Sequence, residues 1–306
     1  MNYTEKGSKL YLFSIVLVAV IGGLLFGYDT AVISGAEKGL QAFFMGADFE
    51  YTDAIHGITS SSALIGCIIG SAVSGFFSSG LGRKNSLFLA GILFFLSALG
   101  SYYPEFLFFE HGVPSYSLLV AFNFYRVLGG IGVGLASAIC PMYIAEIAPS
   151  NIRGTLVSWN QFAIIFGQLV VYFVNFLILG SHANPVIDLV NGVNQIMNPE
   201  AAAWTTETGW RLMFVSEAVP AGLFALLVLL VPETPRYLAM CGKDERALNV
   251  LSRINGASQA KVILVEIKAT TEEKTERLFT YGWMVIFIGI MLSVFQQAVC
   301  INAGVF

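Results

Sequence analysis

Residues 12–34 read LFSIVLVAVIGGLLFGYDTAVIS, a run of 23 residues with a single charged side chain, Asp29. A helix needs about 20 consecutive apolar residues to cross the hydrocarbon core of a bilayer. This run is therefore long enough to span a membrane. A carboxylate costs free energy in hydrocarbon, so Asp29, near the outer end of the run, is a candidate functional residue.

The composition of the whole chain is that of a membrane protein. Hydrophobic residues make up 56% of the 306 residues and charged residues 12%, whereas soluble domains contain about 25% charged residues. The mean hydropathy is +0.73. The cysteines lack metal-ligand spacing, and no basic patch suggests nucleic acid. We therefore expect no cofactor, no metal site and no nucleic-acid partner.

Further apolar runs of spanning length follow the first, which predicts an all-α membrane protein. The last of them begins near residue 282. The predicted spans are 12–34, 56–79, 86–104, 117–145, 156–180, 211–231 and 282–306.

Lys and Arg residues are concentrated at the N-terminus and in the connections after the second, fourth and sixth spans. The stretch 181–209, by contrast, contains neither. Because cytoplasmic loops are enriched in Lys and Arg, we expect a multi-pass protein of the plasma or inner membrane with a cytoplasmic N-terminus. The residues that set this orientation include Lys6, Lys9, Arg83, Lys84, Arg153, Arg236, Lys243 and Arg246.

Residues 236–280 form a polar, charged segment between apolar runs. Ala247, Leu251 and Ile254 recur with helical spacing, and Leu248 extends the same face. The predicted organisation is a six-helix transmembrane half over 1–235, a cytoplasmic helical linker over 236–280 and a seventh transmembrane helix over 281–306. This layout matches a two-half transporter cut just after its midpoint.

Small residues predict which helices touch. Gly66, Gly70 and Ser74 recur every fourth residue in the second span, and Gly130 and Gly134 do so in the fourth. Helices in lipid associate through small residues that let their backbones approach. The glycine-rich stretch 129–134 follows no strand, so we interpret it as a packing surface and not as a phosphate-binding loop.

Glu146, at the end of the fourth span, falls at the cytoplasmic edge of the bilayer. Asp29, Arg126 and Glu217 lie deeper, in the outer half to the middle of the bilayer. Each would be costly alone, so we expect them to face one another. Movement of Arg126 relative to Asp29 would change the affinity of the carboxylate for a proton. Two interpretations remain open, namely proton coupling and a static ion pair that fixes helix positions.

Amide side chains form another group within the spans. An amide is both a donor and an acceptor of hydrogen bonds, which suits a ligand made of hydroxyl groups. Hydrogen bonding between helices is the alternative, but the number of amides favours a polar solute. They are Gln161 and Gln168 in the fifth span and Gln296, Gln297 and Asn302 in the seventh.

The chain resembles the sugar porter family of the major facilitator superfamily nearly end to end. The resemblance lies in long blocks, which are specific to that family. They are GGLLFGYDTAVISG (22–35), ALIGCIIG (63–70), YR (125–126), GGIGVGLAS (129–137), PMYIAE (141–146), NQFAIIFGQ (160–168), GWR (209–211), PETPR (232–236) and FQQ (295–297).

The resemblance implies a fold and roles for particular residues. The fold is the N-terminal six-helix bundle of two inverted three-helix repeats, followed by short cytoplasmic helices and the start of a second bundle. Asp29 corresponds to the protonation site of proton-coupled members, and Arg126 and Glu217 to positions that couple with it. Phe26, Gln161, Gln296, Gln297 and Asn302 correspond to sugar-binding positions. Arg83, Glu146, Arg153, Glu233 and Arg236 correspond to a cytoplasmic network that latches the two halves.

The chain departs from the family pattern at two places. Ser79-Gly80 replaces an acidic-basic pair, so we expect the latch to be weaker or bonded differently. Cys300 replaces a glycine, and the chain continues as 303–306 without the usual tyrosines, which puts the role of Asn302 in doubt.

The expected function is secondary active transport of a monosaccharide, D-xylose or a related pentose or hexose, by proton symport and alternating access. The partners are the sugar, the proton, the lipid bilayer and a missing C-terminal half, without which we expect no transport. Two alternatives are open: an uncoupled facilitator and a non-transporting sugar-binding sensor. No nucleophile–base pair appears in the spans, so we do not expect an enzyme.

Overall fold

The computed structural model describes residues 7–47, 49–106, 112–182 and 203–272, together with 283–284, 287–288 and 291. Within these residues every regular element is a helix. In order they are α1 (Lys9–Met45), α2 (Asp53–Gly80), α3 (Arg83–Tyr102), α4 (Tyr116–Ile147), α5 (Arg153–His182), a π-helical turn η1 (Thr205–Gly209), α7 (Trp210–Ser216), α8 (Ala218–Leu230), α9 (Pro235–Met240), α10 (Asp244–Asn255) and α11 (Ala257–Glu272).

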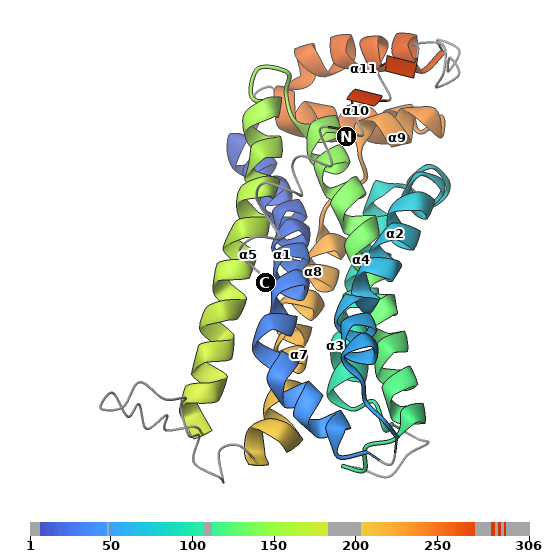
Figure 1. The fold of residues 1–306 in the computed structure, drawn as a ribbon. Coiled ribbons are helices and arrows are strands. Elements are labelled where there is room, and N and C mark those ends of the chain that lie inside the picture. Colours follow the sequence, from blue (N-terminus) through green and yellow to red (C-terminus); the bar gives the residue numbers. More distant parts are fainter. Residues whose placement is uncertain are drawn as a thin grey trace.

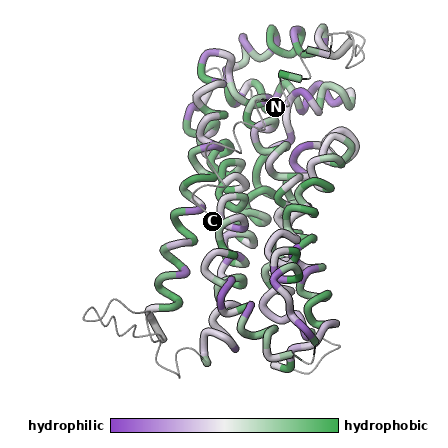
Figure 2. The backbone as a smooth tube through the Cα atoms, in the orientation of Figure 1, coloured by the Kyte–Doolittle hydropathy of each residue, from purple (hydrophilic) through white to green (hydrophobic). Residues whose placement is uncertain are grey.

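Six helical segments are long and apolar enough to cross a membrane: α1 to α5, and η1, α7 and α8 together. Figure 1 shows these segments as a bundle, with α9 to α11 forming a layer across the end of the bundle that holds the N-terminus. The long helices are mostly hydrophobic along their length, whereas hydrophilic turns occur in the layer (Figure 2). We call this end the layer end and the other the opposite end.

Side-chain caps fix the starts of three spans. Ser8, Thr52 and Ser115 each accept a hydrogen bond from the main-chain N–H three residues later, at 3.3, 3.4 and 3.2 Å. Such caps satisfy N–H groups that have no partner within the helix. They explain why α1, α2 and α4 begin before their apolar runs do.

Helix α1 extends well beyond its apolar run. The sequence predicts a span that ends at residue 34, but the helix continues to Met45 because Leu40, Phe43 and Phe44 carry a buried apolar face onward. The apolar run thus covers only part of the helix. Asp29 lies near the middle of α1.

The small residues of α2 and α4 make the predicted contact. A Cβ atom added to Gly66 would lie 2.1 Å from the Val127 carbonyl oxygen, and one added to Gly130 would lie 2.0 Å from that of Ala63. No side chain fits at either position, so the close approach of these backbones depends on glycine.

The sixth span is interrupted at Glu217, between α7 and α8. Pro220 follows three residues later and has no N–H to donate to the Ser216 carbonyl group, which its ring also crowds. The Glu217 N–H donates to Phe214 O at 3.3 Å, a bond to the residue three positions back rather than four as in an α-helix. The interruption places the Glu217 side chain inside the bundle.

The helical pattern predicted within 236–280 is confirmed for the described residues. In α10, Ala247, Leu251 and Ile254 are buried and Leu248 is partly buried. The layer is tied to the bundle where the Ser8 N–H donates to Arg253 O at 2.9 Å. Most of the predicted seventh span lies outside the described residues.

Candidate functional site

An ion pair between α1 and α4 lies at the centre of the bundle. Arg126 Nη1 donates to Asp29 Oδ1 at 2.5 Å, and each side chain is only 2% exposed. The Arg126 guanidinium also lies 5.0 Å from the centre of the Phe214 ring, a cation–π contact. Side chains of α1 and α7 thus contact the Arg126 guanidinium of α4 and fix its position.

Glu217 is the third member of this cluster. It is 1% exposed, and its carboxyl group lies close enough to both Asp29 and Arg126 to interact with them electrostatically. Next to it, Ser216 Oγ and Tyr28 Oη are 2.7 Å apart. The expectation that Asp29, Arg126 and Glu217 face one another is confirmed.

The charge of this cluster does not balance when both acids are ionised. Two carboxylates beside one guanidinium leave a net negative charge in a site buried from bulk solvent, which is unfavourable. Two buried atoms of the cluster, Arg126 Nε and Glu217 Oε1, make no hydrogen bond to a described residue. The geometry therefore suits a site that takes up one proton and in which Arg126 can change its carboxylate partner.

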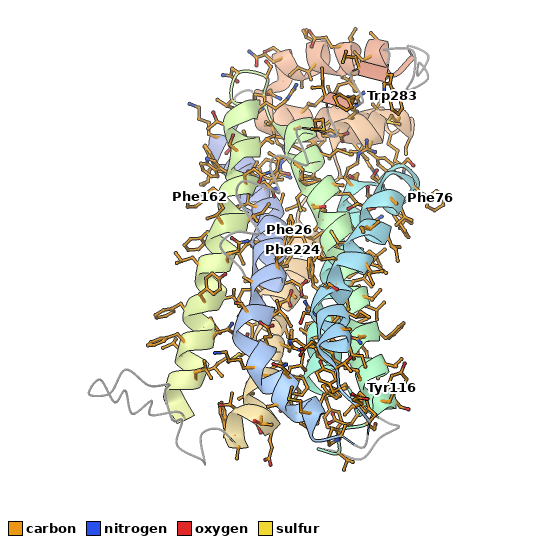
Figure 3. The ribbon with its side chains drawn as sticks, in the orientation of Figure 1. Phe26, Phe76, Tyr116, Phe162, Phe224 and Trp283 are labelled. Atoms are coloured by element: carbon orange, nitrogen blue, oxygen red, sulfur yellow. The ribbon has the colours of Figure 1, made fainter. Side chains whose placement is uncertain are left out.

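The predicted sugar-binding residues on the described helices lie on α1 and α5. Phe26 is partly buried and packs against the core; Figure 3 labels it in the middle of the bundle. Gln161 is exposed on α5, and Gln168 is half-buried on the same helix. The structure does not bring Gln161 into the Asp29 cluster. Gln296, Gln297 and Asn302 lie outside the described residues.

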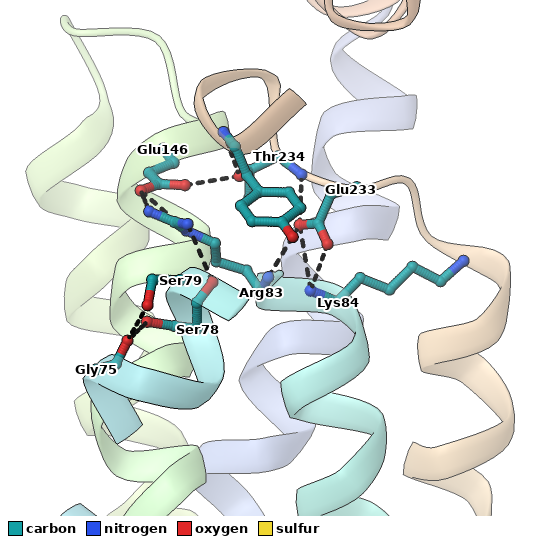
Figure 4. Close-up of polar contacts among 9 residues, drawn as sticks. Gly75, Ser78, Ser79, Arg83, Lys84, Glu146, Glu233 and Thr234 are labelled. Atoms are coloured by element: carbon teal, nitrogen blue, oxygen red, sulfur yellow. Dashed lines mark hydrogen bonds and ion pairs between the residues drawn. The ribbon is translucent and has the colours of Figure 1, made fainter. Parts of the chain in front are cut away.

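Three of the five predicted latch residues form one network at the layer end (Figure 4). Arg83 Nη2 donates to Glu146 Oε1 at 2.8 Å, and Glu146 Oε2 accepts from the Thr234 hydroxyl at 2.6 Å. Glu233 Oε1 accepts from the main-chain N–H groups of Arg83 and Lys84, both at 3.2 Å. The network joins α3, α4 and the segment between α8 and α9.

The carboxylate of Glu233 caps the N-terminus of α3 from a distant part of the chain. Gly82, the N-cap residue, has no side chain to do so. Burial raises the pKa of Glu233, although the N–H groups of Thr234, Lys84 and Arg83 stabilise its charged form. A carboxylate at this position also interacts favourably with the positive end of the helix dipole.

Arg153 and Arg236 do not join this network. Both are exposed, and Arg153 Nη2 donates to the Ala148 carbonyl oxygen at 3.4 Å. With Glu146 they line a cavity of about 490 Å³ between the end of α4 and helices α9 to α11.

The segment around Ser79 and Gly80 contacts other elements through its main chain. The Ser79 hydroxyl donates to its own helix, to Gly75 O at 2.9 Å. The contacts to other elements run through main-chain oxygens: Ser78 O accepts from Arg83 Nη1 at 3.2 Å and Gly80 O accepts from the Tyr237 hydroxyl at 3.1 Å. The expectation of a weaker or differently bonded latch stays a prediction.

Sequence reasoning missed a second buried ion pair, at the opposite end. Arg211 Nη2 donates to Glu105 Oε1 at 2.5 Å, and the two side chains are 4% and 0% exposed. Arg211 also lies 4.5 Å from the Trp210 ring centre. Arg211 stands alone in a segment otherwise poor in basic residues, and this could have indicated an ion pair. Its partner Glu105 lies in a connection between helices, where an acidic residue is common and indicates nothing.

Comparison with known proteins identifies the family. The model of the family described as "Sugar (and other) transporter" matches residues 15–306. The chain belongs to this family. With six spanning helices in the described residues, it is an integral membrane protein of the all-α class.

Two curated members of the sugar transporter family illustrate its range. The D-xylose-proton symporter of Escherichia coli (strain K12) is 47% identical over 304 residues, which cover 95% of this chain and 58% of that protein. The glucose facilitated diffusion protein of Zymomonas mobilis is 33% identical over 307 residues, 98% of this chain and 60% of that protein. The chain thus spans less than two thirds of the length of either relative.

A solved structure agrees with the fold. The major facilitator superfamily proton:xylose symporter XylE, bound to 6-bromo-6-deoxy-D-glucose, superposes with a TM-score of 0.85 at 46% identity. The match covers 96% of this chain and 61% of XylE. The fold is therefore that of a major facilitator superfamily bundle, as the sequence predicts.

Proposed function

We propose that this chain forms the N-terminal half of a transporter that couples uptake of a monosaccharide to symport of a proton. The observation that carries the proposal is the buried cluster of Asp29, Arg126 and Glu217. A single guanidinium bonded to one carboxylate and next to another has two alternative partners. Protonation of Asp29 would weaken its hold on Arg126 and favour pairing with Glu217.

The proposed transport cycle requires a second half. In transporters built of two halves, the substrate site lies between them near the middle of the bilayer. Gln161 is exposed on α5 and so is available to such a partner. Gln168 is half-buried, and its Nε2 is buried without a hydrogen-bond partner among the described residues. We propose that these amides, with Phe26, Gln296, Gln297 and Asn302, bind the hydroxyl groups of the sugar. The name of the 47% identical relative supports D-xylose or a similar sugar.

We propose that the layer end is cytoplasmic. Arg83, Lys84, Arg153 and Arg236 lie there, as do the basic residues of α10 and α11, whereas the acidic Glu105 lies at the opposite end. This distribution follows the enrichment of Lys and Arg in cytoplasmic loops. The network of Arg83, Glu146 and Glu233 then faces the cytoplasm, where together with Arg153 and Arg236 it would hold the two halves closed on that side.

The test compares Asp29→Asn with the parent transporter, completed by its second half and reconstituted in vesicles. Asn cannot take up a proton. We therefore expect a pH gradient to drive sugar accumulation in the parent and not in Asp29→Asn, while sugar exchange without a gradient continues. Asp53→Asn, at the exposed start of α2, is the matched control and should accumulate sugar normally. Accumulation by Asp29→Asn would refute proton coupling through this residue.

An uncoupled facilitator is the second candidate. The short bond between Asp29 and Arg126 would serve equally well as a static link between α1 and α4. The relative from Zymomonas mobilis, named a facilitated diffusion protein, belongs to the same family. In this case the parent itself would equilibrate sugar without accumulating it under a pH gradient.

A further inference from the structure

Two buried serines on α3 differ from most of the buried serines that the structure describes. Ser97 and Ser101 are each 1% exposed, and their hydroxyl groups make no hydrogen bond to a described residue. Ser60 Oγ on α2 is also buried without a partner in the part of the chain that the structure describes. The remaining buried serines each donate to a main-chain carbonyl three or four residues back, at 2.7 to 3.2 Å; they are Ser62, Ser74, Ser78, Ser86 and Ser252. That local bond is the usual way to satisfy a hydroxyl within a helix.

Ser97 lies close to the Asp29–Arg126 pair. A Cβ atom added to Gly129 of α4 would lie 2.4 Å from Ser97 Oγ and 3.9 Å from Asp29 Oδ1. The two oxygens are therefore at most 6.3 Å apart, the sum of those distances. They are not hydrogen-bonded to each other. One water molecule bridges polar atoms about 4.5–5.5 Å apart, because each of its hydrogen bonds is about 2.8 Å long.

The other unpartnered atoms of the cluster point to the same ligand. Arg126 Nε and Glu217 Oε1 are buried without a hydrogen-bond partner among the described residues. Several unsatisfied polar groups around one ion pair are unfavourable in a membrane protein core. Water, which both donates and accepts, satisfies such groups when it has two to four polar partners.

Ser101 continues the row toward the opposite end. It lies four residues after Ser97 on the same face of α3, about 6 Å further along the axis. Helix α3 ends at Tyr102, whose carbonyl oxygen accepts from Arg211 Nη1 at 3.1 Å, and Arg211 is in turn paired with Glu105. The serines thus lie between the Asp29 cluster and the buried ion pair at that end.

We propose that Ser97 and Ser101 bind a short chain of water molecules that carries the proton between the opposite end of the bundle and Asp29. The proposal rests on the proposed proton symport and adds a route to it. Each water or hydroxyl oxygen forms one O–H bond as it accepts a proton and breaks another as it releases one, so the number of O–H bonds in the chain does not change. The last transfer places the proton on a carboxylate oxygen of Asp29.

The kinetic test uses the double variant Ser97→Ala/Ser101→Ala in the reconstituted transporter. Proton uptake on addition of sugar is followed with a pH-sensitive dye inside the vesicles, and sugar exchange is measured without a gradient. We expect proton uptake to slow about tenfold while exchange stays within about twofold of the parent, because exchange requires no net proton movement. Near-normal exchange also shows that the variant is folded. Ser62→Ala, which removes a hydroxyl satisfied by its own helix, is the control and should leave both rates unchanged.

The outcomes separate this proposal from the proposed function. Proton uptake by the double variant at the parent rate, or an equal loss of uptake and exchange, would overturn the water chain while leaving symport intact. Absence of sugar-driven proton uptake in the parent would overturn symport, and the water chain with it. A second measurement needs no transport: an experimental structure that shows water should contain a molecule within about 3.2 Å of Ser97 Oγ. A dry site there would also refute the proposal.

Discussion

Gly82, between α2 and α3, is the position where a single methyl group should be most damaging to the layer end. Its φ is 92° and its ψ is 166°, a conformation that only glycine adopts readily. A Cβ atom at this position would lie 2.3 Å from Glu233 Oε2 and 2.7 Å from Tyr237 Cε1. Gly82→Ala therefore strains the backbone and displaces the carboxylate that caps α3.

The expected loss of stability follows from these two effects. Backbone strain of this kind costs about 1–3 kcal/mol. Displacing Glu233 weakens its bonds to the N–H groups of Arg83 and Lys84, and a hydrogen bond to a charged group contributes about 1.5–3 kcal/mol. The total is about 3–6 kcal/mol. At about 2–4 °C per kcal/mol, the value for domains of 150–250 residues, Tm should fall by about 6–24 °C.

The assay is thermal unfolding of the purified protein in detergent. Gly80→Ala is the matched control, because a Cβ atom there has no neighbour within 4 Å, and its Tm should stay close to that of the parent. In the double variant Gly82→Ala/Glu233→Ala the clash with the carboxylate is absent, so its Tm should lie above the value expected from adding the two single effects. If Gly82→Ala unfolds at the same temperature as Gly80→Ala, the reasoning about this junction is wrong.

Two further predictions concern the rest of the bundle. Burial raises the pKa of Glu105, but the hydrogen bonds and charge of Arg211 outweigh burial and hold this pKa below the ordinary 4.5. The stability that the pair contributes is thus fully present above pH 4.5. It is lost as the pH falls through the lowered pKa. Glu105→Gln should lower the free energy of unfolding by about 3–5 kcal/mol at pH 7. The Tm values of parent and variant should converge as the pH is lowered. A difference in Tm that stays constant with pH would contradict the pairing. Gly70→Ala should destabilise the bundle by at least about 1–3 kcal/mol, because its Cβ would lie 2.3 Å from Ile131 O. Gly75→Ala on the same helix has no neighbour within 4 Å and should be neutral or slightly stabilising, so equal Tm values for the two would count against the packing argument.

The sequence predicts the central cluster well because membrane spans leave charges few choices. Asp29, Arg126 and Glu217 are isolated in apolar runs, and pairing with one another is the favourable arrangement in hydrocarbon. The contact of α2 with α4 is predictable for a related reason, since small residues repeated every fourth position mark a helix interface. In both cases the membrane removes the alternatives that water would offer.

The layer end is harder to predict because water and main-chain groups compete there. Arg83 forms an ion pair with Glu146, whereas Arg153 and Arg236 are exposed. Nothing in the sequence around these three arginines predicts this difference. The cap that Glu233 provides for α3 depends on the backbone angles of Gly82 and joins residues about 150 positions apart. A pattern of residue types does not contain that information.

The packing of α1 against α5 limits how the central cluster can respond to a proton. A Cβ atom on Gly27 would lie 1.8 Å from Ile164 O, and one on Gly167 would lie 2.1 Å from Leu24 O. Backbones this close interlock, so sliding of one helix along the other would require them to separate. Asp29 is thus held on a rigid pair of helices. In the proposed transport cycle, the change on protonation is therefore carried by the Arg126 side chain and by movement of the bundle against the proposed second half, and not by sliding of α1 along α5.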